Sequence, residues 1–113
     1  MHNPSNPSLR FFYSEELHAK TLQLLDTLEQ AEDPKKHRGA LGELVVELTN
    51  TGMDYYFIKP LQLAGVGFMV QQSANLSMAA ALKIIGSVIR NIIGRMDKAQ
   101  LIVVCGYIRQ LML

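Results

Sequence analysis

The residue pair with the clearest capacity for chemistry is Glu15 and His18, in the run EELH. A helix would place both side chains on one face, where a carboxylate and an imidazole can bind the same metal ion. Carboxylate-bridged di-iron bundles use two such motifs and two further Glu side chains, whereas this chain has one motif. A dimer would bring two motifs together, and Glu43 or Glu47 of each copy would have to supply the extra ligand. A metal-dependent enzyme assembled across a dimer is therefore our second alternative. An isolated Glu-x-x-His pair is more often an exposed pair without a metal.

Nucleophilic and phosphate-binding chemistry find less support. Cys105 is the single cysteine and lies in the apolar run LIVVCGYI, a setting that raises a thiol pKa and so opposes formation of a reactive thiolate. Asp54 lies beside two tyrosines that could exchange protons in a cleft. A Tyr at a helix end, however, usually buries its ring and leaves its hydroxyl exposed to water. The sequence contains no glycine-rich phosphate loop and no Gly-x-Ser-x-Gly motif. We expect no catalytic residue and no cofactor, and we favour a protein that is not an enzyme.

The composition predicts one small domain with apolar surface to cover. The chain has 113 residues, of which 49% are hydrophobic and 19% charged, against a typical charged share of about 25%. A small monomer has much surface for its volume, so a low charge content suggests that another copy, a partner or a ligand covers part of it. Lys83, Arg90 and Arg109 interrupt the apolar segments, and the N-terminus does not resemble a signal peptide. We therefore expect no membrane span and a cytoplasmic location.

The two halves of the chain are oppositely charged. Residues 1–54 hold nine acidic and five basic residues, and residues 55–113 hold one acidic and six basic residues. Either the halves face each other within a fold or across a dimer, or the basic half binds an anionic partner. The basic strip that contains Lys83 and Arg90 has no interleaved aromatic residues. We do not expect nucleic-acid binding, while an anionic lipid surface remains an alternative.

Residues 76–96, LSMAAALKIIGSVIRNIIGRM, are the stretch around which we expect the chain to be organised. In a helix their apolar side chains cover about half of the cylinder and leave a narrower polar strip. This breadth predicts a central helix. Glycines on or beside the strip would let another backbone come close. From them we predict an interface between chains that includes Gly86, Ile89, Ile93 and Gly94.

The remaining sequence predicts further helices. Residues 1–8 should form a flexible arm and residues 9–113 a single helical domain. Ser14 should cap a first helix that begins near Glu15 and runs to about Glu32, and Asp33 followed by Pro34 should start a second helix. This second helix should fade at residues 50–52. A last helix should start at Asp97.

The middle of the chain is harder to assign. Residues 53–59 are rich in aromatic side chains that would suit a strand, but an isolated strand has no partner here, so we favour a helix. Pro60 should break or kink this helix at Lys59. Residues 61–72 could form a short third helix, and residues 71–75 should form the turn before the central helix.

Together these patterns predict an all-α fold, a compact bundle of four to five helices around residues 76–96. The leading functional hypothesis is a non-catalytic helical protein-interaction module, homo-oligomeric, whose apolar interface comes from the C-terminal half. The first alternative is a binder of an apolar ligand or of an anionic lipid surface. Its binding residues would be the aromatic and Met side chains of the middle of the chain: Tyr55, Tyr56, Phe57, Phe68, Met69 and Met78.

Overall fold

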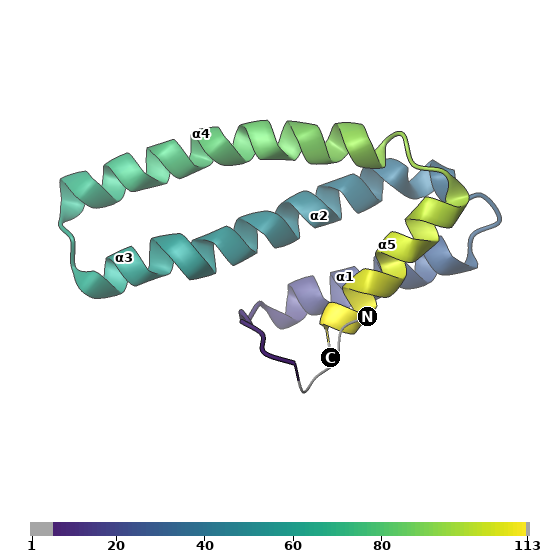
Figure 1. The fold of residues 1–113 in the computed structure, drawn as a ribbon, viewed down its shortest axis with the longest axis horizontal. Helices are drawn as coiled ribbons and strands as arrows, with labels where there is room; N and C mark the ends of the chain where they lie inside the picture. The colour runs from purple at the N-terminus through teal and green to yellow at the C-terminus, as the bar shows by residue number, and fades with distance from the viewer. Residues whose placement is uncertain (1–5, 113) are drawn as a thin grey trace.

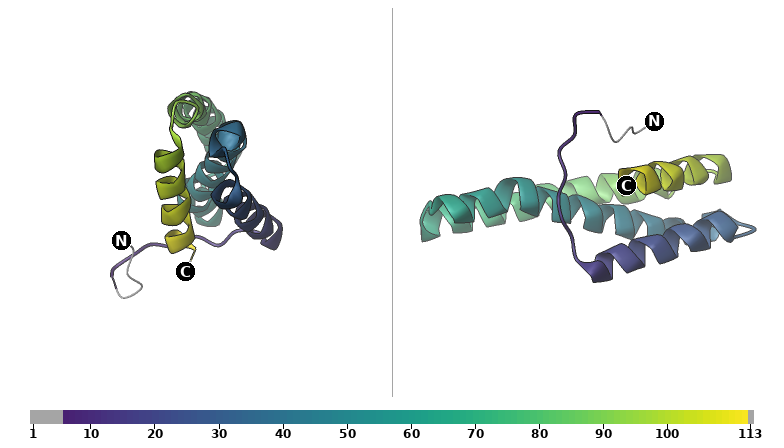
Figure 2. Two further views of the ribbon diagram at one scale, coloured as in Figure 1. Left: turned by 90° about the vertical axis from the view of Figure 1, so that its right-hand side faces the viewer. Right: turned by 90° about the horizontal axis from the view of Figure 1, so that it is seen from below.

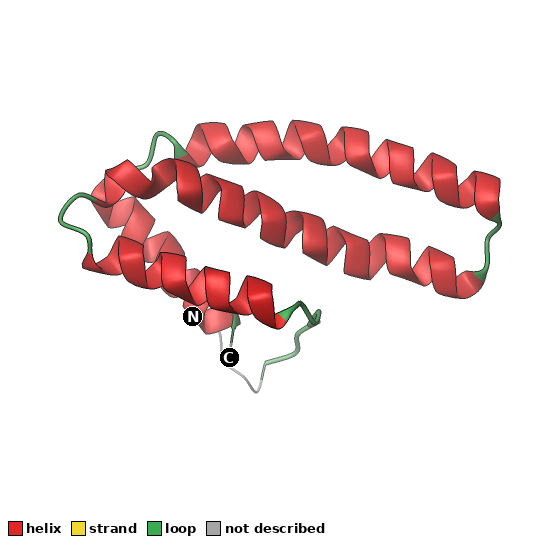
Figure 3. Ribbon diagram, turned by 180° about the vertical axis from the view of Figure 1, so that it is seen from behind, coloured by secondary structure: helices red, strands yellow, loops and turns green. Residues whose placement is uncertain are grey.

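The structure, a computed structural model, describes residues 6–112. All regular elements in this range are helical, which confirms the predicted all-α fold (Figure 1, Figure 3). In chain order they are α1 (Glu15–Gln30), a 3-10 turn (Pro34–His37), α2 (Arg38–Met53), a π-helical turn (Asp54–Ile58), α3 (Lys59–Ala64), α4 (Phe68–Ile93) and α5 (Lys98–Leu111). Residues 6–14 have no helix, and residues 1–5 of the predicted arm lie outside the described range.

Side-chain caps fix the helix starts that the sequence predicted. The Ser14 hydroxyl accepts a hydrogen bond from the Leu17 backbone N–H at 3.0 Å, so α1 begins at Glu15 as expected. The Asp97 carboxylate accepts a bond from the Gln100 N–H, and the Gln100 side chain accepts one from the Asp97 N–H. This reciprocal pair satisfies two backbone donors at the start of α5. Both starts are confirmed.

The long arm of the fold is a helical hairpin. In it α2, the π-helical turn and α3 run end to end as one rod, and α4 returns antiparallel to it (Figure 1). Of the break or kink predicted at Pro60, the break does not occur, because α3 continues through this residue; the backbone changes from π-helical to α-helical at Lys59. Just before it, the Lys59 N–H donates to the Asp54 carbonyl, five residues back. The wider π-helical turn gives a proline ring, which has no N–H of its own, room against the preceding turn. Residues 53–59 are helical, as we favoured.

The hairpin reverses at Gly65 and Gly67, which have backbone φ angles of 65° and 94°. Only glycine adopts this left-handed region at little cost, so this pair makes the turn between α3 and α4. The turn predicted at residues 71–75 is wrong, because these residues lie inside α4. Their polar side chains bond along the helix instead, with the Gln71 amide donating to the Asn75 side-chain oxygen at 3.1 Å.

The hydrophobic core lies at the end of the hairpin opposite its turn, where α1 and α5 pack side by side (Figure 2). α1 and α5 have 16 and 14 residues, or about 24 and 21 Å, whereas the 26 residues of α4 span about 39 Å. Two short helices therefore cover only part of the hairpin. The buried core cluster consists of Leu17, Leu25, Leu28, Leu41, Leu44, Ile93, Leu101, Cys105 and Ile108.

The predicted helix at 76–96 exists, but it begins at Phe68, ends at Ile93 and is not central. Of its side chains, Ile93 is the one in the buried core cluster. The sequence shows how apolar a helix is, but it does not show which helices are long enough to cover it. Here α4 extends beyond the reach of α1 and α5, so most of it lies on the outside of the chain.

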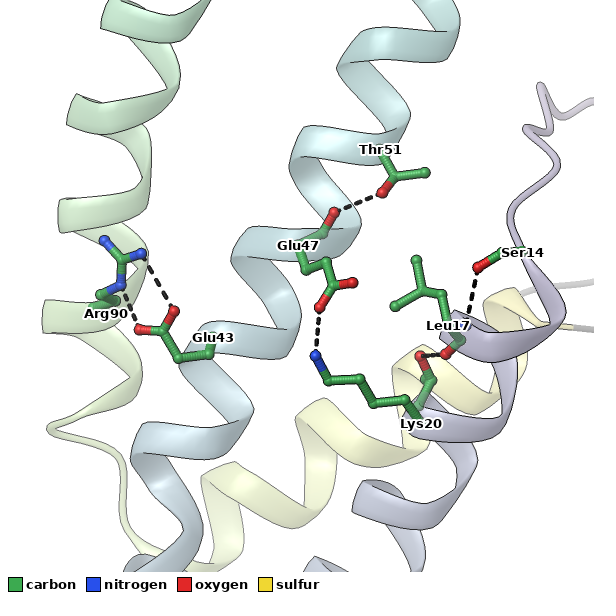
Figure 4. A network of polar contacts seen from close by, with 8 residues as sticks. Ser14, Leu17, Lys20, Glu43, Glu47, Thr51 and Arg90 are labelled. Atoms are coloured by element: carbon green, nitrogen blue, oxygen red, sulfur yellow. Dashed lines mark hydrogen bonds and ion pairs between the residues drawn. The ribbon is translucent and has the colours of Figure 1, made fainter.

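Ion pairs join the helices that pack around the core (Figure 4). They support the interpretation in which the acidic and basic halves face each other within the fold, since two arginines of the second half bind carboxylates of the first. Each pair is at least partly exposed, so its contribution to stability is small. The pairs are Lys20–Glu47 at 2.6 Å between α1 and α2, Glu43–Arg90 at 2.6 Å between α2 and α4, and Arg109 with Asp26 and Glu29 between α5 and α1.

Candidate interaction surface

Helix α4 exposes a large apolar surface. In its most apolar window of 18 residues only 11% is buried, whereas the core helix of a small domain would be mostly buried. The exposed large side chains extend along the whole helix: Phe68, Met69, Val70, Leu76, Ile84, Ile85, Val88 and Ile92. Exposed apolar surface of this extent is typical of sites for interaction or ligand binding.

One side of α4 carries a continuous apolar stripe without charge. On a helix of 3.6 residues per turn the stripe occupies an arc of about 80°. Lys83 and Arg90 lie on the other side of the helix, more than about 130° from the centre of the stripe. We call the stripe the α4 apolar face and define it as Val70, Ala74, Ser77, Ala81, Ile85, Val88 and Ile92.

An apolar groove of about 710 Å³ runs between α4 and the α3 side of the hairpin. The N-terminal half of the α4 apolar face forms one wall, and the other wall carries Phe57 and Leu61. Among the residues predicted to bind a ligand, Phe57, Met69 and Met78 meet here. The lining is Phe57, Leu61, Met69, Val70, Ser73, Ala74, Ser77, Met78 and Ala81.

A second groove, of about 610 Å³, lies on the other side of α4 and is the more polar of the two, with both polar and apolar side chains in its lining. Asp54 and Asn50 on one helix and Lys83 and Arg90 on the other contribute to its lining. In this region the Arg90 guanidinium binds Glu43, and this contact lowers the pKa of the carboxyl. The hairpin is therefore amphipathic, with one charged side and one apolar side.

No protein-family model matches the chain, and neither a curated protein nor a solved structure matches it.

Among the helices described in residues 6–112, α4 is long and apolar enough to cross a membrane, judged by length and composition alone. Charged side chains lie on and beside this segment. Lys83 lies near the middle of α4, and the helix packed against α4 carries Glu43 and Glu47. Ionised side chains in the hydrocarbon region cost several kcal/mol, about 2.5–3.5 each even on permissive scales.

The other predicted ligand residues lie elsewhere. Phe68 projects from the hairpin turn with 79% of its surface exposed. Tyr55 and Tyr56 belong to an aromatic cluster, with their ring centroids 6.3 and 6.0 Å from that of Phe11. The segment before α1 crosses the hairpin at this point, and Phe11 packs over Gly52 (Figure 2). Sequence reasoning missed this long-range contact.

The four residues predicted for an interface between chains are engaged within this chain. A side chain at Gly86 would place its Cβ 3.5 Å from Val46 on α2. Ile93 is buried in the core and Ile89 packs against it, while the Gly94 N–H donates to the Arg90 carbonyl to end α4. Gly86 and Ile93 are buried, Ile89 is partly buried and Gly94 is exposed. The α4 apolar face lies on another side of the helix.

Glu15 and His18 lie on the first turns of α1, next to the segment before the helix. The His18 Nδ1 is 2.8 Å from the Tyr13 hydroxyl oxygen. Glu43 and Glu47, considered as extra ligands, bind Arg90 and Lys20 instead. In the described part of the chain no three His, Cys, Asp or Glu side chains are close enough together to hold a metal ion.

Cys105 is fully buried on α5. Its burial raises the pKa of the thiol, and the nearby Glu29 carboxylate adds to the effect. The neutral thiol is therefore favoured, as expected for a small apolar core residue.

Proposed function

We propose that the protein is a non-catalytic helical interaction module that forms a homo-oligomer through the α4 apolar face. The observation that carries this proposal is the exposure of a charge-free apolar stripe along a helix of 26 residues. A layer of two helices with one apolar side buries that side against another layer in stable folds. A second hairpin would supply this layer and complete a four-helix bundle.

The surface area supports the same conclusion. The chain exposes 7846 Å², whereas a compact monomer of 12.6 kDa exposes about 6,200 Å². Part of the excess lies on the segment before α1, where Leu9 and Phe12 are exposed. A standard interface removes about 800 Å² from each partner.

The shape supports it as well. The radius of gyration is 16.0 Å, against about 13 Å for a compact chain of this length. The difference comes from the hairpin, which extends beyond the core (Figure 1). A partner that lies along the extended hairpin would bury more of its apolar side than a partner that meets it at one end.

A single charge on the α4 apolar face tests the proposal. Val88→Glu would place a carboxylate within the buried surface, and such an uncompensated charge opposes association strongly. Ser87→Glu adds the same charge on the preceding residue, about 100° away and exposed. By light scattering we expect the unmodified chain and Ser87→Glu to have a mass of twice 12.6 kDa or more, and Val88→Glu to be a folded monomer. Equal masses for the two variants would contradict the proposal.

The groove of about 710 Å³ favours one further candidate, a binder of an apolar ligand. Its lining by Phe57, Met69 and Met78 suits an acyl chain or a similar flexible apolar molecule. The same groove includes part of the α4 apolar face, so a ligand and a second copy would compete for it. Native mass spectrometry of freshly purified protein distinguishes them, because a ligand adds a small fixed mass to each chain.

A further inference from the structure

The residues of the α4 apolar face are spaced symmetrically about Ala81. Val70 and Ile92 lie eleven residues from it, Ala74 and Val88 seven, and Ser77 and Ile85 four. A two-fold axis through Ala81 therefore maps every position of the stripe onto another position of the stripe. An interface between identical copies of this kind needs such self-complementarity.

The sizes of the side chains are not symmetric about Ala81. This asymmetry favours one direction of a second α4 helix, antiparallel, over the other. Between the turn and Ala81 the stripe carries the small residues Ala74 and Ser77, and beyond it the branched residues Ile85 and Val88. If two copies of α4 run antiparallel, Ile85 and Val88 of each copy meet Ser77 and Ala74 of the other, and only at the ends of the stripe does a branched residue, Ile92, meet another, Val70. If they run parallel, branched residues meet branched residues and small ones meet small ones, which leaves one half overpacked and the other with a cavity.

From this pattern we infer that a second copy of the chain packs antiparallel on the α4 apolar face, with the two-fold axis at Ala81. This inference rests on the proposed function and specifies its geometry. Val88 of each copy lies on Ala74 of the other, Ile85 on Ser77, and Ile92 on Val70. Each hairpin turn then lies beside the core end of the partner.

The apolar groove fits this arrangement. Ala74, Ser77 and Ala81 form part of its lining, and their small side chains leave room beside α4. Branched side chains from the partner would enter the groove and remove its apolar lining from water. Antiparallel helix dipoles add a small favourable term, and the small residues near the axis allow the two helices to approach closely.

Disulfide cross-linking tests the direction of packing. The native Cys105 is buried, so it can stay in every variant. Ala81→Cys places two thiols at the axis, within the Cβ separation of about 3.5–4.5 Å that a disulfide needs. Ala79→Cys is the matched control, because this exposed alanine lines the polar groove on the other side of the helix. Under mild oxidation we expect the Ala81→Cys band to shift from 12.6 kDa to twice that mass on a non-reducing gel, and the control band to stay.

A mixed pair separates antiparallel from parallel packing. Val88→Cys alone should remain monomeric on the gel, and a mixture of Val88→Cys with Ala74→Cys chains should form a covalent dimer. Cross-linking of Val88→Cys alone, or no cross-link of Ala81→Cys in a chain that is dimeric by light scattering, would overturn the antiparallel geometry and leave the proposed function intact. A chain that is monomeric by light scattering would overturn both. So would a monomer that floats with phosphatidylcholine–phosphatidylserine vesicles, because lipid would then cover the face.

Discussion

At the scale of single residues, the Glu43–Arg90 pair gives a pH-dependent contribution to the contact between α2 and α4. The guanidinium donates to both carboxylate oxygens, from Nε at 2.6 Å and from Nη2 at 3.3 Å, and this bonding lowers the pKa of Glu43 in the folded chain. A carboxyl whose pKa is lower in the folded state stabilises the fold above its unfolded pKa. This contribution is lost as the pH falls through the folded pKa.

Glu43→Gln should therefore lower the melting temperature at pH 7 and have little effect at about pH 2, where the carboxyl is protonated in both states. The measurement is thermal unfolding by circular dichroism at the two pH values. The effect at neutral pH should be small, because both side chains are half exposed. A melting-temperature difference that does not change with pH would contradict the assignment.

Cys105 provides a second residue-scale prediction. Its thiol is buried and its pKa is raised by burial, and the thiolate is the species that reacts. Ellman's reagent should react slowly with the native chain and detect one thiol per chain once guanidinium unfolds it. Rapid labelling under native conditions would show that the packing around α5 does not cover this side chain.

At the same scale, local signals could be predicted from the sequence and long-range ones could not. Ser14 and Asp97 cap helices through bonds to residues three positions away, so their neighbours in the sequence suffice to identify them. The contact between Phe11 and Gly52 joins segments about forty residues apart. No local pattern encodes it, because it depends on where the hairpin passes the segment before α1.

At the scale of elements, the hairpin turn depends on glycine. Gly65 has a left-handed backbone, φ 65°, and a Cβ atom added to it would have no heavy atom within 4 Å, so backbone strain alone decides the effect of a substitution. Gly65→Ala should lower the free energy of unfolding by about 1–2 kcal/mol. The control is Gly106→Ala in α5, which is equally free of contacts but helical, and which should raise it by up to about 1 kcal/mol. Urea denaturation measures both, and changes of equal sign would contradict this explanation of the turn.

Two errors of prediction also belong to this scale. Pro60 and the polar residues 71–75 are breakers by residue type, yet both lie inside helices. The π-helical turn before Pro60 makes room for the ring, and the glycines at 65 and 67 reverse the chain first. Because the turn lies at these glycines, α4 begins eight residues before the predicted start at residue 76. It is therefore longer than α1 and α5, the two helices that cover the core.

At the scale of the whole molecule, the composition predicted uncovered apolar surface, and the fold shows where it lies. The low charge content predicted that some apolar surface would be covered by another copy, a partner or a ligand. We predicted the interface at Gly86 and its neighbours because the sequence does not distinguish the face of α4 that meets α2 from the one that meets solvent. That distinction requires the position of α2.

Hydrogen exchange should report the covering of this surface. In a single chain the half of the hairpin near its turn has few buried contacts, so its amides should exchange quickly. In the proposed oligomer, peptides from residues 68–81 should be protected, and Val88→Glu should remove this protection while the amides of α1 and α5 keep theirs. Unchanged exchange in residues 68–81 would show that no second chain covers them.

The most direct test of the central claim is the molar mass of the unmodified chain in solution, measured by sedimentation equilibrium across the micromolar range. We predict a mass of twice 12.6 kDa, or a higher multiple, that falls toward the monomer value on dilution. A well-folded chain that sediments at 12.6 kDa at every concentration would contradict the proposed oligomer.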